Sequence, residues 1–290
     1  MTDFLLFVKS IIIIRLNNKT TMIYYKRLIF IFLIVSSCQS TGQLITEGSI
    51  NNKIEEASAA EIIAQSNLIW TIQDSGNDSE LYGLNEKGDI VKDITITNAS
   101  NIDWEDLTSD PEGNIYIGDF GNNNEKRKYF RILKVNHKDL NKDTLQVETI
   151  EFTLPKKQDS KDFEAFFYFN NYFYIISKET KKFIVLKVPN KIGKHKAIVS
   201  SDFNLNGKNN KITSADISDN GETIILLNHN KLWKLSNFKA DDFFSGNIEA
   251  LPFKHNSQKE GICFKTNSKV IITDEHNGAE GGNIYSFDIN

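Results

Sequence analysis

The sequence has few cysteines, no long apolar run and little helical periodicity. Only Cys38 and Cys263 occur in 290 residues, which excludes a disulfide framework. The apolar segment 28–35 has eight residues, far fewer than the roughly 20 that a membrane-spanning helix needs. No stripe with a period of 3.6 residues follows it. Because 40% of the residues are hydrophobic and 25% are charged, the composition is nevertheless that of a folded globular protein.

An excess of positive charge is also missing. The chain has 34 Lys and Arg against 38 Asp and Glu, a formal net charge of −4. Residues 1–37 carry five basic residues and one acidic residue, so removal of this segment would leave −8. Proteins that bind nucleic acid usually have a basic surface. We therefore expect no nucleic-acid partner.

The segment that begins at Met22 has the pattern of an export signal. A short basic stretch, 22–27, precedes the apolar run 28–35, and small residues then lead to Cys38. Val35-Ser36-Ser37-Cys38 resembles the bacterial lipobox, which implies cleavage before Cys38 and attachment of lipid to its thiol. Several acyl chains give stable membrane anchoring. The alternatives are an ordinary secretory signal and a chance cysteine after an apolar run.

These features divide the chain into three expected parts. Residues 1–37 are a leader, 38–55 are the lipidated cysteine and a polar tether with room for one strand, and 56–290 are the folded domain. Residues 1–21 precede the signal pattern, which indicates a start at Met22 or a two-part anchor. Gln39 is not the Asp that would indicate inner-membrane retention, so we expect an outer-membrane lipoprotein, facing the periplasm or the surface. Cys263 lies in an apolar context and is expected to be a buried thiol.

Four segments of the domain share one layout. Each has an acidic or polar pair, a short strand, a turn, and a strongly apolar strand that ends in polar residues. Fourteen residues separate two marker positions in every copy. The marker pairs are Glu105 and Asp119, Glu164 and Lys178, Ala215 and His229, and Glu260 and Asp274. A fifth copy, 57–74, fits with a small gap and ends at Asp74. Such repetition is typical of propellers and other repeat folds.

Further strands follow each of these segments. A third strand with alternating apolar residues is expected at 81–84, 130–135, 183–188, 231–235 and 283–287. A fourth is expected in most copies, as at 91–96 and 144–152. Four strands, repeated five times, predict an all-β protein, a β-propeller of five blades, with six as the competing count. We expect residues 44–56 to complete the last blade and close the ring.

Three motifs carry a resemblance to a known family. They are Trp70-Thr-Ile-Gln-Asp-Ser-Gly76, Asp103-Trp-Glu-Asp106 and Tyr116-Ile-Gly-Asp-Phe-Gly-Asn-Asn123. They resemble W-T-x-x-D-S-G, D-W-E-D and Y-I-G-D-F-G-N-N of a family of secreted bacterial β-propellers. Lys259-Glu260-Gly261-Ile262 is similar, more distantly, to an element of SdiA-regulated, phytase/esterase-like and gluconolactonase-type propellers. The resemblance implies a propeller over 56–290. The chain departs from it at Gln73, where His is common, and at Ala215.

The repeated glutamates are candidate metal ligands. Glu105, Glu164 and Glu260 share one repeat position, so the ring would bring them to one level around its axis. Three carboxylates together favour a cation, and oxygen ligands suit Ca²⁺. Candidates for additional ligands are Asp74, Asp119 and Asn122. The alternative is that these carboxylates accept backbone N–H bonds at turns between blades.

Other residues are candidates for a ligand-binding rim. They are Asp103, Trp104, Asp106, His229 and Asp274. Trp104 is expected either to stack against a ligand ring or to pack between blades. Ser/His/Asp catalysis has no support, because no G-x-S-x-G motif occurs. The histidines lack the spacing of a zinc site.

Two functions follow from these observations. The first is a binding module at the cell envelope, anchored to the membrane by lipid, whose partner is a protein, a glycan or a small ligand. The second is a Ca²⁺-dependent hydrolase of phosphoesterase or lactonase type, with the repeated glutamates at its metal. Whether the chain is an enzyme stays open at this point, because propellers host many functions.

Overall fold

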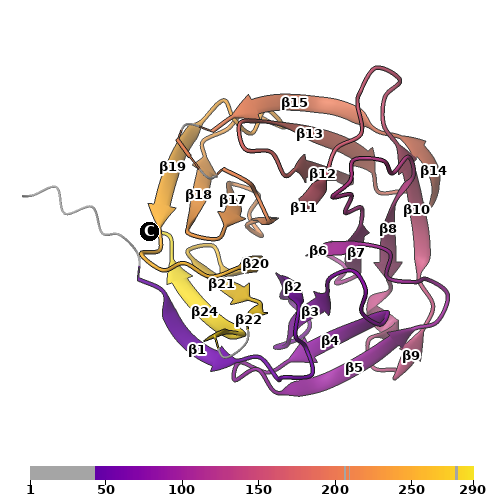
Figure 1. Ribbon diagram of the computed structural model, residues 1–290, viewed down its shortest axis with the longest axis vertical. Helices are drawn as coiled ribbons and strands as arrows, with labels where there is room; N and C mark the ends of the chain where they lie inside the picture. The colour runs from indigo at the N-terminus through magenta and orange to yellow at the C-terminus, as the bar shows by residue number, and fades with distance from the viewer. Residues whose placement is uncertain (1–42, 206, 209, 278–279) are drawn as a thin grey trace, which may run out of the picture. The chain divides into compact units, whose positions relative to one another are not determined.

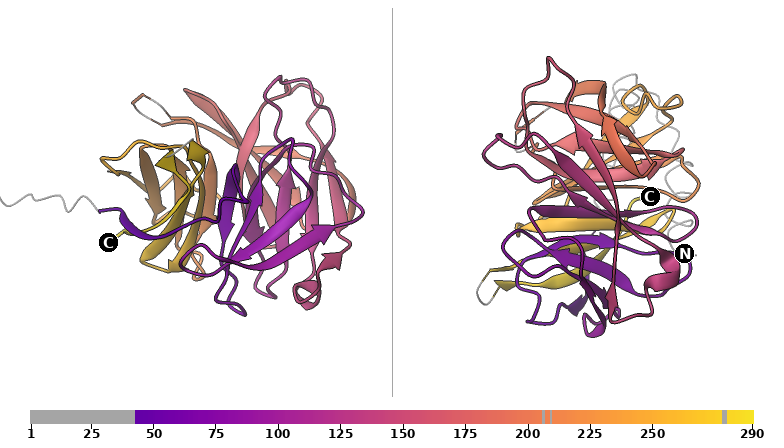
Figure 2. Two further views of the ribbon diagram at one scale, coloured as in Figure 1. Left: turned by 60° about the horizontal axis from the view of Figure 1, so that its bottom comes forward. Right: turned by 90° about the vertical axis from the view of Figure 1, so that its right-hand side faces the viewer.

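The computed structural model describes residues 43–205, 207–208, 210–277 and 280–290. The described residues form one compact unit, in which five sheets are arranged around a common centre (Figure 1). Seen from the side, the strands run between two faces of the ring (Figure 2). The predicted all-β propeller is confirmed, and the number of blades is five. Cys38 and the predicted leader lie outside the described residues.

Each blade has an innermost strand, a second strand and two or three outer strands. In blade 1 these are β2 (Ala57–Glu61), β3 (Ile69–Gln73), β4 (Glu80–Leu84), β5 (Ile90–Ile96) and β9 (Thr144–Leu145). In blade 2 they are β6 (Trp104–Ser109), β7 (Ile115–Asp119), β8 (Phe130–Val135), β10 (Glu148–Thr153) and β14 (Gly193–Lys196). The outermost strands β9 and β14 pair in parallel with their neighbours.

The remaining blades have four strands each. Blade 3 contains β11 (Phe163–Phe169), β12 (Tyr172–Ser177), β13 (Lys182–Pro189) and β15 (Ile198–Asn204). Blade 4 contains β16 (Ser214–Ile217), β17 (Thr223–Asn228), β18 (Lys231–Ser236) and β19 (Asn247–Pro252). Blade 5 contains β20 (Lys259–Thr266), β21 (Lys269–Asp274), β24 (Asn283–Asp288) and β1 (Ile45–Ser49). A small hairpin, β22 (His276–Asn277) and β23 (Glu280–Gly281), precedes β24.

The core consists of five apolar clusters, one between each pair of neighbouring blades. Successive side chains of a second strand enter different clusters. In β12, Phe173 and Ile175 pack toward blade 2, whereas Tyr174 and Ile176 pack toward blade 4. Because blades cover both faces of a second strand, its sequence is apolar at consecutive positions rather than alternating. Cys263 is a buried free thiol in the cluster between blades 5 and 1, as expected.

Strand β1 closes the ring as predicted. It pairs antiparallel with β24, so the last blade contains strands from both ends of the domain (Figure 1). Residues 45–49, within the segment expected to be a tether, therefore belong to the propeller. Such closure couples the first and last blades, so opening the ring requires breaking a sheet.

One predicted strand divides in the structure. The segment 144–152 was expected to be continuous, but β9 joins blade 1 and β10 joins blade 2. A three-residue 3₁₀-helix, η1 (His137–Asp139), precedes this segment. In the described part of the chain, no helix is long and apolar enough to cross a membrane.

Candidate acidic metal centre

Three innermost strands carry a β-bulge at the repeated glutamate. The pairing of β6 with β7 passes from Trp104 directly to Asp106, which leaves Glu105 as the extra residue. Glu164 in β11 and Glu260 in β20 are bulged in the same way. Blade 4, which has Ala215 at this position, pairs without a bulge. Bulges redirect side chains and often lie beside active sites, and here they direct the glutamates toward the centre of the ring.

The bulges lie at the face of the ring where innermost strands begin and second strands end, called the upper face here. Residues that directly follow second strands also reach its centre. Asp74 follows β3, Lys178 follows β12 and His229 follows β17. The sequence repeat aligned them with Asp119 and Asp274, which are instead the last residues of their strands. Because strand side chains alternate, a shift of one residue reverses their direction.

Five carboxylates at the upper face form the acidic cluster, which consists of Asp74, Asp103, Glu105, Asp162 and Glu164. Oxygen atoms of Asp74, Asp103 and Glu105 lie within 4.8 Å of one another, and so do oxygens of Glu105, Asp162 and Glu164. Two oxygens bound to one Ca²⁺ at about 2.3–2.6 Å are at most about 5 Å apart. Both sets therefore have the spacing that a single cation requires, and Glu105 belongs to both.

The Glu105 carboxylate is buried and unpartnered. The residue is 5% exposed, and no described residue donates a hydrogen bond or forms an ion pair with its carboxylate. Asp103 adds a second orphan, since its Oδ1 atom is buried without a hydrogen-bond partner in the described structure. Buried polar atoms are nearly always hydrogen-bonded in folded proteins. Asp103 Oδ1 is such an exception, and carboxylate oxygens of Glu105 and Asp103 lie within 4.8 Å of each other, which fits a cation site.

Gly121 provides the space beside this carboxylate. A Cβ atom at this position would overlap Glu105 Oε1 and the Asp103 carboxyl carbon. The Gly121 amide also donates to the Asp103 carbonyl, at 3.1 Å. The loop after β7 therefore packs its backbone against both carboxylates.

Burial and mutual repulsion raise the pKa values in the cluster. Burial raises the pKa of the Glu105 carboxyl well above its ordinary value, and the charges of Glu164, Asp74 and Asp103 raise it further. Burial raises the pKa of Asp74 to about 6, against the opposing hydrogen bond from the Ser75 amide. The pKa of Asp103 is also raised by burial. A group of carboxylates with raised pKa values binds a cation in exchange for protons.

The other two glutamates have basic side chains as partners. Lys178 Nζ forms an ion pair with Glu164. Burial lowers the pKa of Lys178, but the charges of Glu164, Glu260 and Glu105 raise it by more. Glu260 accepts from His229 Nε2 at 3.0 Å and lies outside both three-residue sets. The three glutamates thus surround the centre, as the repeat predicted, but only Glu105 and Glu164 come together with aspartates.

Two predicted ligands serve other purposes. Asp119 pairs with Arg127 at 2.7 Å and with Arg131. Asn122 donates to Ser160 Oγ and the Lys161 carbonyl and accepts from two backbone amides. Because both side chains have their full set of partners and lie outside the acidic cluster, we do not include them in the candidate metal centre.

The predicted rim residues occupy different environments. Asp103 belongs to the acidic cluster, and the His229 side chain is 42% exposed. Trp104 is 0% exposed and packs in the cluster between blades 1 and 2, so it has no face for a ligand. Asp274 is buried and accepts from the Asn283 amide and the Tyr285 hydroxyl. The structure thus corrects the rim assignment of Trp104 and Asp274, because each side chain packs inside the protein.

Asp106 is a structural strut rather than a rim residue. It is 0% exposed and accepts the amides of Phe166 in β11 and Ala215 in β16, at 3.1 and 3.2 Å. It also accepts from Ser214 Oγ at 2.8 Å. Asp106 therefore joins the innermost strands of three blades. The alternative role considered for the repeated glutamates was to accept backbone N–H bonds between blades. Asp106 has this role instead.

Three charged residues of the upper face were not predicted from the sequence to belong to the site. Asp162 stands two residues before Glu164, as Asp103 stands before Glu105, so the repeated D-x-E pattern carried a signal for it. Glu275 follows β21 and repeats the position of Asp74. Burial raises the pKa of Glu275 to about 8, aided by Glu260, Asp74 and Glu56. Lys178 was treated only as a repeat marker.

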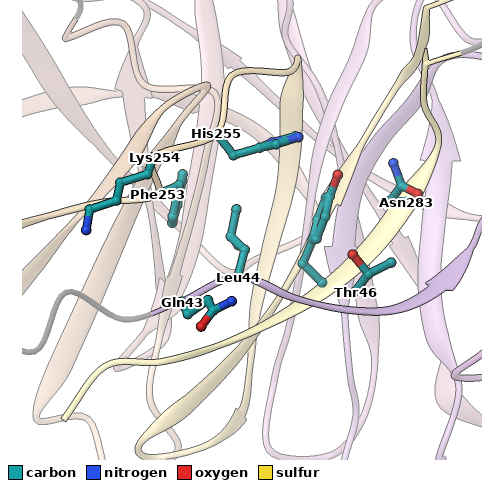
Figure 3. Close-up of a pocket in the computed structure, with 8 residues that line it drawn as sticks. Gln43, Leu44, Thr46, Phe253, Lys254, His255 and Asn283 are labelled. Carbon is teal, nitrogen blue, oxygen red and sulfur yellow. The ribbon is translucent and has the colours of Figure 1, made fainter.

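A separate hollow of about 680 Å³ lies between β24, the start of the described chain and the segment after β19. Figure 3 shows the Leu44 side chain pointing toward His255 in this hollow. Behind it, buried Lys259 donates to Ser257 Oγ at 2.7 Å and to the His229 carbonyl at 3.1 Å. Burial lowers the pKa of Lys259 to about 8. This lysine fixes the backbone beneath His229 but contributes nothing to the acidic cluster.

Comparisons with known proteins show the fold and no family. No protein-family model matches the chain, and no curated protein matches it in sequence. A gluconolactonase from Xanthomonas campestris has a similar structure, with a TM-score of 0.50 and 8% identity over 89% of this chain and 93% of that one. The PQQ-bound aldose sugar dehydrogenase of Streptomyces coelicolor follows, with a TM-score of 0.49 and 6% identity over 86% and 98%. At these identities the likeness is one of fold alone, and the motif-based family resemblance stays a prediction.

Proposed function

We propose that this chain is a cation-binding β-propeller that acts as a ligand-binding module at the cell envelope. The observation that carries the proposal is Glu105, which is 5% exposed, has no partner among the described residues and belongs to both metal-compatible sets. Carboxylate oxygens favour hard cations, and Ca²⁺ tolerates the irregular geometry that a blade junction offers. The ligands are Asp74, Asp103, Glu105, Asp162 and Glu164.

The test is thermal unfolding of the full chain with Ca²⁺ or with chelator. At a Ca²⁺ concentration 100 times its Kd, we expect the Tm to rise by about 5–10 °C, because binding to the native state alone stabilises it. The rise should disappear in Glu105→Gln. A control, Glu112→Gln, removes the same charge from an exposed turn at the opposite face and should keep it. An unresponsive wild type, or an equal rise in Glu105→Gln, would refute the site.

The proposed location at the cell envelope rests on the signal pattern and Cys38. We expect the wild-type chain to fractionate with membranes and Cys38→Ser to lose this attachment. Recovery of the wild type in the soluble fraction, without lipid on Cys38, would contradict the proposed location at the envelope. It would not bear on the cation site.

A metal-assisted hydrolase is the second candidate function. The observation that favours it is the Glu260–His229 pair beside the acidic cluster. Glu260 holds His229 through Nε2, and no described residue bonds Nδ1, which leaves that atom to accept or deliver a proton. A bound divalent cation supplies Lewis acidity. The gluconolactonase with the similar fold makes sugar lactones the first substrates to screen, followed by phosphate esters.

This second function has its own test. Ca²⁺-dependent hydrolysis should fall at least about 100-fold in His229→Gln if His229 transfers a proton, while the Ca²⁺-induced rise in Tm persists. Absence of hydrolysis in the wild type, together with a normal rise, would leave the binding function alone.

A further inference from the structure

The most basic surface of the upper face is formed by two loops from neighbouring blades. The first loop, 122–129, follows β7, and the second, 155–161, precedes β11. Together they carry six basic residues and two acidic ones, Glu125 and Asp159, a formal charge of +4 in a chain whose net charge is −4. We call residues 122–129 and 155–161 the basic loop pair. Its charge is opposite to that of the acidic cluster beside it.

Hydrogen bonds hold the two loops side by side. Ser160 Oγ donates to the Arg127 carbonyl at 2.7 Å, and Asn122 Nδ2 donates to the Lys161 carbonyl at 2.8 Å. The Asn122 amide also donates to Asp162 of the acidic cluster, at 2.8 Å. The basic loop pair is therefore an ordered platform attached to the wall of the candidate metal centre, so a ligand that docks on it pays little entropy for ordering it.

Only part of the positive charge has a structural use. Arg127 binds Asp119 and the Tyr129 carbonyl, and Lys161 pairs with Glu179 at 2.9 Å. The other four cations are exposed, and no described residue forms an ion pair with them. They are Lys126, Lys128, Lys156 and Lys157. Two pairs of unpaired cations on adjacent loops suit a ligand with repeated negative charges.

An aromatic ring accompanies these cations. Tyr129 is 61% exposed, although aromatic side chains lose free energy by facing water. Arg127 Nε donates a hydrogen bond to the Tyr129 carbonyl at 2.9 Å, which holds the Tyr129 backbone in place. The face of an aromatic ring is negative and packs against C–H groups, such as those on the face of a sugar ring. An acidic peptide would use the lysines but would not need this ring.

We propose that the basic loop pair binds an acidic polysaccharide, with sugar carboxylates on the four lysines and a sugar ring on Tyr129. This interaction goes beyond the proposed cation site and does not depend on it. Since the acidic cluster repels anions, the ligand is expected to lie along the loops rather than over the centre of the ring.

The test is binding of the full chain to polygalacturonate in EGTA, by calorimetry. Excluding Ca²⁺ makes the result independent of the cation site. The variant Lys126→Ala/Lys128→Ala/Lys156→Ala/Lys157→Ala should bind at least about tenfold more weakly, since each exposed charge contact contributes modestly. The matched control removes four exposed lysines elsewhere and should bind as the wild type does. Its substitutions are Lys87→Ala, Lys138→Ala, Lys211→Ala and Lys239→Ala.

Two further measurements identify the class of ligand. Raising NaCl from about 50 to about 300 mM should weaken wild-type binding, because salt screens exposed charges. Tyr129→Ala should weaken polygalacturonate binding about threefold or more and leave the weaker binding of poly-glutamate unchanged. The proposal is overturned if wild type fails to bind polygalacturonate, if the quadruple variant binds normally, or if poly-glutamate binds as tightly as the polysaccharide.

Discussion

Glu105 shows how one extra residue in a strand changes the chemistry of a side chain. In an unbulged strand, residues at this level would continue the alternation of the blade and pack between sheets, as Ala215 does in blade 4. The bulge in β6 instead directs a carboxylate to the centre of the ring, where burial raises its pKa. Gly121 completes the arrangement because it leaves room for the carboxylate. Both residues are needed, one for the charge and one for the space.

Gly121→Ala tests this arrangement because it adds a single atom, the Cβ. The added Cβ overlaps the positions of Glu105 Oε1 and the Asp103 carboxyl carbon. We expect the carboxylates to be displaced, the Ca²⁺-induced rise in Tm to fall by at least about half, and stability to fall by about 1–3 kcal/mol from overpacking. Asn123→Ala, an exposed change two residues away, should have neither effect. A wild-type Ca²⁺ response in Gly121→Ala would show that the cation does not use this space.

At the scale of elements, polar side chains join the innermost strands of different blades. Asp106 bonds β11 and β16, and Thr108 accepts from the Tyr168 amide in β11 at 3.1 Å. Ser214 and Asp216 repeat this pattern at the junction of blades 4 and 5, accepting from the Ile262 and Phe264 amides of β20. Innermost strands of neighbouring blades are not paired in one sheet. These side chains therefore satisfy amides that no strand partner reaches.

Replacing Asp106 should lower the free energy of unfolding. Asp106→Ala leaves two buried amides and the Ser214 hydroxyl without their acceptor, and each lost partner costs about 1–3 kcal/mol. We expect urea unfolding to show a loss of about 3 kcal/mol or more. Asp143→Ala, at an exposed position, should change stability by less than about 0.5 kcal/mol. If the two variants lost equal stability, the inter-blade role of Asp106 would be wrong.

At the scale of the whole molecule, the upper face is electrostatically divided. Carboxylates from blades 1, 2 and 3 meet near the centre, where Lys178 pairs with Glu164. His229 pairs with Glu260, and the basic loop pair lies outside them. The folded ring thus concentrates negative charge that the unfolded chain would disperse. The proposed cation site therefore predicts that the free energy of unfolding depends on both pH and cations.

The pH dependence has a definite sign without metal. The pKa values of Asp74 and Glu275 rise from 3.8 to about 6 and from 4.5 to about 8 on folding. The groups facing them are Glu56, Asp103, Glu260 and Lys178, with the Ser75 amide. Between the unfolded and folded pKa values the native state holds more protons. Their stabilising contribution is complete below about pH 4 and is lost as the pH rises through 6 to 8.

We expect the Tm in EGTA to fall by at least about 4 °C between pH 5 and pH 8. Ca²⁺ should reverse this fall, because it binds the deprotonated carboxylates, and its effect should be larger at pH 8 than at pH 5. Differential scanning calorimetry at both pH values gives the comparison. A Ca²⁺ effect that is larger at pH 5 would contradict the assignment of the carboxylates.

Much of the architecture was predictable from local patterns along the chain. The repeat of apolar strands and Asn- and Gly-rich turns predicted an all-β propeller of five blades and its closure by residues near position 45. Those predictions succeeded because strand alternation and consecutive apolar residues reflect which faces are buried, a property written into each segment. The recurrence of Glu105, Glu164 and Glu260 likewise indicated that they would surround the axis.

The composition of the site depended on contacts between segments far apart in the chain. A bulge or a one-residue shift at a strand end reverses a side chain, so repeat alignment could not separate Asp74 from Asp119. Nor could it show that Arg127 and Arg131 neutralise Asp119 while Glu105 stays unpartnered. The sequence left Trp104 either at the rim or packed between blades, and the structure shows that it packs between blades. Pairing, burial and pKa depend on distance in space, and only the closed ring brings these groups within that distance.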